Sequence, residues 1–111
     1  MRKLLLLIVA GMIMSLQGCS DDPPQFRVRN DRPSKANVQV KTSGGNTINI
    51  NDVEPGTATP YQGAAEGIIE ATATIQNETV SPSTSFRAGN DNSYTIVVAN
   101  TAPPTLVVIS P

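Results

Sequence analysis

The chain contains no histidine, no tryptophan and only one cysteine. Without histidine it cannot build a Ser-His-Asp or Cys-His nucleophile system. One cysteine without histidine also excludes an internal disulfide and an ordinary zinc, haem or iron–sulfur site. The sequence therefore predicts neither a bound metal nor another cofactor.

Basic residues are also scarce, at 8 against 9 acidic residues in 111. Removing Arg2 and Lys3 with the leader described below leaves 6 basic and 9 acidic residues, a net charge of −3. A general nucleic-acid-binding domain is basic, so we exclude nucleic acid as a partner.

The amino-terminal segment has the pattern of a secretory signal. Arg2 and Lys3 precede an apolar run of 11 residues, Leu4–Met14. This run is too short to cross a bilayer as a mature helix, which takes roughly 20 residues. It leads into Leu16-Gln17-Gly18-Cys19, which resembles the bacterial lipobox.

The resemblance implies that the Cys19 thiol accepts a diacylglyceryl group and that a peptidase cleaves after Gly18. Several acyl chains anchor firmly because each buried CH₂ contributes about 0.8 kcal/mol. The alternative is an ordinary secretory signal with an incidental cysteine. Ser20 follows the cysteine, which favours export to the outer membrane. We expect a signal peptide over 1–18 and a lipid-anchored tether over 19–25, with the side of the membrane left open.

Residues 26–111 are expected to form one all-β domain. Val, Ile and Thr are frequent, and apolar and polar residues alternate as in half-buried strands. Seven or eight short strands separated by turn residues predict a single antiparallel two-sheet sandwich of the immunoglobulin-like type. The segments that carry this signal are 26–29, 37–41, 47–51, 69–75, 83–87, 94–98 and 106–109.

Three local predictions accompany this assignment. The Leu106–Ile109 segment is apolar on both faces, which predicts a strand buried on both sides. The Ser43–Asn46 and Gly89–Asn92 segments contain glycine and asparagine, which suit hairpin turns.

Several motifs follow one another in a recognisable order: Phe26–Asn30, Ala36–Val40, Val53–Tyr61, Gly67–Ile75, Ala88–Val98 and Pro104–Val108. Their order over residues 26–110 resembles a bacterial family of small extracytoplasmic β-sandwich domains of unknown function. The resemblance implies a secreted or surface-attached sandwich and supplies no catalytic residues.

Charge is segregated along the domain. Residues 26–42 hold five basic residues and one acidic residue, whereas residues 43–86 hold five acidic residues and no basic one. If Arg27, Arg29 and Lys41 project from one sheet face, they form a binding face for anionic glycans or lipid headgroups. The alternative is cross-strand pairing with the acidic segments on an ordinary solvated face.

Other polar residues have structural explanations. Tyr61 and Tyr94 could be exposed binding aromatics, but tyrosines on alternating strands more often cap the core. Asn51-Asp52 and Asn90–Asn92 carry oxygen atoms of the kind that calcium binds. Turns favour the same residues, so we expect turns at both places.

Glu66 and Glu70 are the one near pair of carboxylates for acid–base chemistry, and Glu70 falls on the face expected to be solvated. The sequence therefore predicts no enzyme. It predicts an envelope lipoprotein with a non-catalytic binding or structural module, whose partner is an envelope protein or an anionic glycan. The alternatives are a periplasm-facing accessory subunit of an envelope or secretion complex and a small hydrolase.

Overall fold

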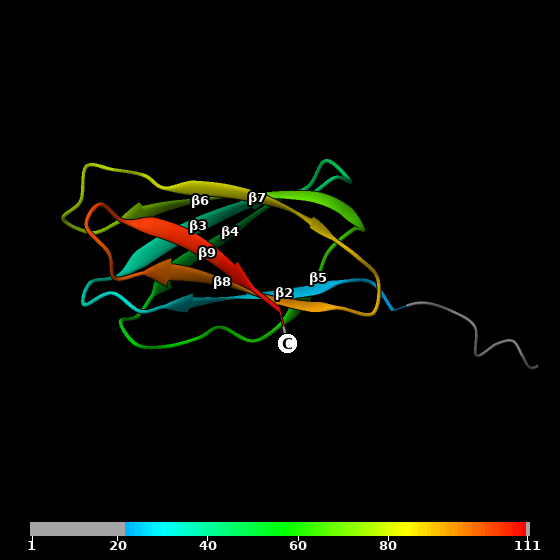
Figure 1. Ribbon diagram of the computed structural model, residues 1–111, viewed down its shortest axis with the longest axis horizontal. Helices are drawn as coiled ribbons and strands as arrows, with labels where there is room; N and C mark the ends of the chain where they lie inside the picture. Colours follow the sequence, from blue (N-terminus) through cyan, green and yellow to red (C-terminus); the bar gives the residue numbers. More distant parts are fainter. Residues whose placement is uncertain (1–21, 111) are drawn as a thin grey trace, which may run out of the picture.

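The computed structural model describes residues 22–110, which form two four-stranded sheets packed face to face (Figure 1). One sheet has the order β5-β2-β8-β9 and the other the order β4-β3-β6-β7. The strands are β2 (Gln25–Asn30), β3 (Ala36–Lys41), β4 (Thr47–Val53), β5 (Gln62–Gly63), β6 (Gly67–Ile75), β7 (Ser83–Ala88), β8 (Ser93–Ala99) and β9 (Thr105–Ile109). The predicted all-β sandwich of seven or eight strands is confirmed.

The signal peptide, the cleavage position at Gly18 and the acylated Cys19 fall outside the described residues. Within residues 22–110, no helix is long and apolar enough to cross a membrane.

Side-chain alternation explains the core. Residues of β3 and β6 alternate strictly between buried and exposed positions over most of their length. Their buried members face the other sheet, where Phe26 and Ile96 are also fully buried. Each buried Val, Ile or Phe contributes roughly 1.5–3 kcal/mol to folding. The alternation in the sequence thus defines the inner faces of both sheets.

One strand pair departs from the antiparallel arrangement. β2 runs parallel to β8, with a register from Gln25↔Ser93 to Asn30↔Val98, whereas every other pair between named strands is antiparallel. These two strands are far apart in sequence and are not joined by a hairpin, so no turn imposes opposite directions.

The two predicted hairpin turns have different outcomes. Ser43–Asn46 joins β3 to β4, which pair in one sheet, and Gly45 adopts a φ of 87°. The Gly89–Asn92 segment is a turn, but it joins β7 to β8, which lie in different sheets, so the hairpin prediction is wrong. This loop instead holds the start of the described chain, because the Asp91 N–H donates to the Asp22 carbonyl at 2.9 Å.

The prediction that residues 106–109 are buried on both sides is also wrong. β9 is an edge strand that pairs with β8 alone among the described strands. Leu106 is buried on the inner face, but Val107 and Ile109 on the outer face are 45% and 44% exposed. An apolar run on both faces predicts a buried central strand, but the topology places this strand at the edge of the sheet.

A buried arginine contacts residues of three loops at the end of the sandwich opposite residue 22. Arg32 is only 7% exposed. Its Nη1 donates to the carbonyls of Ala99 and Thr101 at 3.0 Å, and its Nη2 pairs with Glu78 at 2.9 Å. Its backbone N–H donates to the side chain of buried Asn30 at 3.0 Å. In the sequence, Arg32 is only one of the five basic residues within residues 26–42.

Candidate functional site

The outer face of the β4-β3-β6-β7 sheet is covered by exposed amide and hydroxyl side chains. We call this surface the polar face and define it by Asn37, Gln39, Asn49, Asn51, Thr72, Thr74, Ser83 and Ser85. These residues point outward because they alternate with the buried core residues of the same strands.

The strand register arranges these side chains in cross-strand rows. One row runs across all four strands, because Gln39 lies opposite Asn49 on one side and Thr72 on the other, and Thr72 lies opposite Ser83. Neighbouring strands are about 4.8 Å apart, so adjacent polar groups lie at a similar spacing. The result is a flat array of hydrogen-bonding groups.

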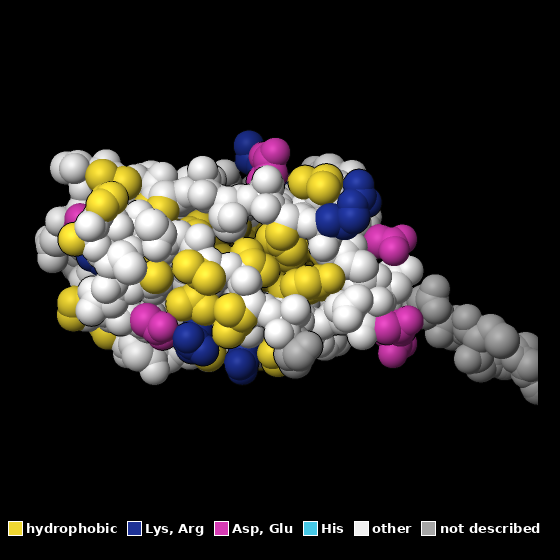
Figure 2. Space-filling view, viewed as in Figure 1, with side chains coloured by type: hydrophobic (Ala, Val, Ile, Leu, Met, Phe, Trp, Pro, Cys, Tyr) yellow, Lys and Arg dark blue, Asp and Glu magenta, His cyan; other side chains and the backbone are white. Residues whose placement is uncertain are grey.

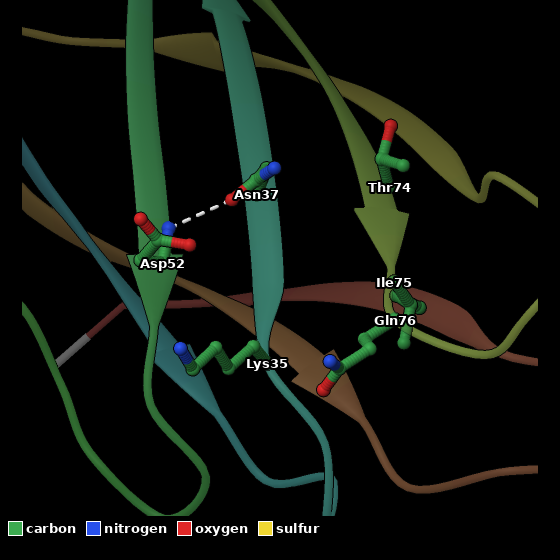
Figure 3. A pocket seen from close by; sticks show the side chains of 6 residues that line it. All are labelled: Lys35, Asn37, Asp52, Thr74, Ile75 and Gln76. Atoms are coloured by element: carbon green, nitrogen blue, oxygen red, sulfur yellow. Dashed lines mark hydrogen bonds between the residues drawn. The ribbon is translucent and has the colours of Figure 1, made fainter.

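Three open recesses indent this face. The first measures about 280 Å³ and is lined by Lys35, Asn37, Asp52, Thr74, Ile75 and Gln76 (Figure 3). The second measures about 440 Å³ and is lined by residues 70–72 and 83–85. The third, of about 200 Å³, lies over the centre of β3 and shares Asn37 and Thr74 with the first. The recesses therefore follow one another across the sheet.

The first recess is shaped by a backbone irregularity. The β3–β4 register shifts between Ala36 and Val38, and Asp52 adopts a φ of 57°. Its N–H donates to Asn37 Oδ1 at 2.7 Å, as the dashed line in Figure 3 shows. A non-glycine residue in this conformation costs of order 1–3 kcal/mol, and such irregularities concentrate at functional sites. The predicted turn at Asn51-Asp52 is wrong, because both residues lie within β4.

Both basic and acidic side chains border the first recess. Lys35 lies beside the end of β4, and its Nζ is 3.7 Å from Glu54 Oε2. Farther along the face, Lys41 lies directly opposite Glu70. The polar face thus has no strong excess of either charge.

The three basic residues expected on one binding face are not brought together. Arg27 and Arg29 lie on β2 and Lys41 lies on β3, which belong to different sheets. The loop between β2 and β3 crosses from one sheet to the other, so outward side chains before and after it point in opposite directions. Alternation within each strand could not reveal this crossing.

Arg27 and Arg29 do share the outer face of the β2 sheet. Arg27 Nε donates to Thr95 Oγ1 at 3.0 Å, and its guanidinium lies 4.8 Å from the Tyr61 ring centroid. Arg29 pairs with Asp31 at 2.9 Å, and this hydrogen bond and charge raise the pKa of Arg29.

The two tyrosines differ. Tyr61 is 40% exposed, so the prediction that it caps the core is wrong. Tyr94 packs against Phe86 with 5.1 Å between ring centroids, and its hydroxyl accepts the Gly89 N–H at 2.9 Å, as a core-capping tyrosine does.

The carboxylates singled out for acid–base chemistry are both exposed. Glu70 lies on β6 opposite Ser85, and Glu66 lies in the loop before that strand. Across residues 22–110, no group of three or more His, Cys, Asp or Glu residues is placed to hold a metal ion. The chemistry that this arrangement provides is hydrogen bonding, because amides and hydroxyls both donate and accept.

No protein-family model and no curated protein matches this sequence. The resemblance of residues 26–110 to the family of small extracytoplasmic sandwiches therefore stays a prediction. Among solved structures, the chain is similar to the NMR structure of a protein from Eubacterium rectale, with a TM-score of 0.55 and 16% sequence identity. The similarity covers 87% of this chain and 94% of that one, and it shows a shared fold.

Proposed function

We propose that the chain is an outer-membrane lipoprotein, anchored through Cys19, whose β-sandwich is a non-catalytic binding module for an extended, hydroxyl-rich glycan. The observation that carries this proposal is the polar face, where three recesses lie side by side on one sheet and are lined mainly by amide and hydroxyl groups.

The open shape of the recesses favours a polymer over a small molecule. Pockets that enclose a small ligand usually measure about 300–1,000 Å³ and bury most of its surface. The three recesses measure about 280, 440 and 200 Å³ and are open to solvent. A single small ligand would bury little surface in any one of them, whereas a chain laid across the strands contacts all three.

The chemistry of the face favours a neutral glycan. A sugar polymer offers hydroxyl groups that both donate and accept, which complement the rows of Asn, Gln, Thr and Ser side chains. Lys41 lies opposite Glu70, so this face does not select an anionic polymer. The proposal therefore replaces the anionic glycan expected from the basic residues with a neutral one.

Thr72 and Thr74 test this proposal because both are exposed, outward-facing residues of the central strand β6. The Thr72→Val/Thr74→Val double variant keeps the side-chain shape and strand propensity but removes two hydroxyl groups. Each lost hydrogen bond costs about 1 kcal/mol, so we expect at least roughly tenfold weaker binding.

The measurement is a screen of neutral and anionic polysaccharides, followed by calorimetric titration with the tightest binder. Thr79→Val, the same change in an exposed loop outside the polar face, is the control and should bind as the unmodified protein does. Absence of binding to every polysaccharide, or equal affinity of the double variant, would refute the glycan proposal.

A further inference from the structure

The opposite face of the sandwich has a different chemistry. On the outer face of the β5-β2-β8-β9 sheet, two arginines lie among exposed apolar side chains. We call this surface the docking face and define it by Arg27, Arg29, Tyr61, Val107 and Ile109. It holds three of the five exposed large hydrophobic residues found within residues 22–110. Exposed apolar groups gathered on one side commonly mark a contact surface.

The strand register builds this face from two parallel rows. One row runs from Arg29 through Val97 to Val107, and the other from Arg27 through Thr95 to Ile109. Each row therefore has a cation on β2 and an exposed aliphatic side chain on the edge strand β9. Figure 2 shows the two sheets edge-on, and basic side chains appear along the lower side, where Figure 1 places β2, with an acidic group beside them.

This combination matches the boundary of a phospholipid bilayer. Aliphatic and aromatic side chains enter the region between headgroups and acyl chains, while arginines bind the phosphates. Arg27 has no ion-pair partner among the described residues, and its guanidinium stacks on Tyr61. The domain as a whole carries a charge of −3 after cleavage, 6 basic against 9 acidic residues. Arg29 on the same face is paired with Asp31, so Arg27 is the cation of the docking face that attracts an anionic surface.

The anchor lies close enough to bring this face to the membrane. Cys19 is three residues before Asp22, whose carbonyl accepts the Asp91 N–H. Three fully extended residues span at most about 10 Å. The row of Arg27, Thr95 and Ile109 starts two residues into β2, so it lies near the tethered end of the sheet. The polar face belongs to the other sheet and points the opposite way.

We propose that the docking face rests on an anionic phospholipid bilayer, which turns the polar face away from the membrane towards its ligand. This inference rests on the lipid anchor of the proposed function. It adds a second membrane contact, made by folded residues, that sets the orientation of the domain.

The absence of tryptophan makes a direct test available. The acylated full chain with Val107→Trp is bound to vesicles containing phosphatidylglycerol, and quenching by brominated lipid is measured. Interfacial side chains lie roughly 5–10 Å into the headgroup and acyl boundary, so we expect about twofold quenching and a shift of emission to shorter wavelength. Thr72→Trp on the polar face is the matched control, with no lipid quenching and full quenching by aqueous iodide.

Adding Arg27→Glu/Arg29→Glu to the Val107→Trp chain should abolish the quenching while the protein still sediments with the vesicles. If iodide quenches the Val107→Trp and Thr72→Trp proteins equally while both sediment with the vesicles, the proposed membrane contact is refuted and the proposed anchor is not. Failure of the full chain to sediment would overturn the anchor and the contact together. A blue shift that depends on protein concentration and occurs without lipid would assign the face to a second copy of the chain, which also overturns the proposal.

Discussion

Replacing Cys19 with alanine should move the protein from the membrane fraction to the soluble fraction. The residue lies outside the described residues, so this expectation comes from the lipobox-like Leu16-Gln17-Gly18-Cys19 sequence. A single acyl chain gives only marginal binding, with an association constant of about 10⁴ M⁻¹, whereas several chains on one residue hold firmly. The docking face alone, with two arginines and three exposed apolar side chains, should not retain the protein.

The measurement is fractionation of cells fed with labelled palmitate. Cys19 is the sole cysteine, so no other cysteine can carry the label. Arg27→Glu/Arg29→Glu is the control: it should stay labelled and remain in the membrane fraction. Label retained in the Cys19→Ala protein, or an unlabelled parent protein in the soluble fraction, would contradict the anchor.

Replacing Arg32 with alanine should lower the free energy of unfolding by about 3 kcal/mol, the magnitude seen when one partner of a buried charged network is removed. The variant loses the donors to the Ala99 and Thr101 carbonyls and the partner of Glu78. Three loops at one end of the sandwich then lose their shared contact. For a domain of this size, the thermal midpoint should fall by roughly 12–24 °C.

Thermal and denaturant unfolding of the Arg32→Ala and Arg87→Ala variants checks this expectation. Arg87→Ala is the control, because Arg87 is exposed on β7 and forms no salt bridge with another described residue. Its thermal midpoint should stay close to that of the parent protein. A similar small change for Arg32→Ala would show that the loops are held by packing without the arginine.

The strands themselves could be predicted because burial imposes a period of two on the sequence. The alternation over residues 69–75 falls within β6, and the turn at Ser43–Asn46 coincides with a hairpin. Assignment of strands to sheets could not be read in the same way. Apolar and polar residues alternate in the same way whichever sheet a strand joins. The sequence therefore does not indicate that the loops after β2 and after β7 cross from one sheet to the other.

The candidate site was missed for a related reason. Asn37, Gln39, Thr72 and Thr74 read individually as ordinary solvated positions, and only the register places them in rows over three recesses. The conformation of Asp52 depends on a register shift, which local sequence does not encode. Arg32 read as one more surface cation, because its partners lie 46 to 69 residues away.

Chemical-shift mapping of the acylated protein in detergent micelles, titrated with the polysaccharide that binds most tightly, locates the binding surface residue by residue. We expect the shifts to concentrate on the polar face, in residues of β3, β4, β6 and β7 around Asn37, Gln39 and Thr74. Residues of β2, β8 and β9 should remain unchanged. Shifts confined to the docking face, or to the loops at either end of the sandwich, would contradict the assignment of the β4-β3-β6-β7 sheet as the binding surface.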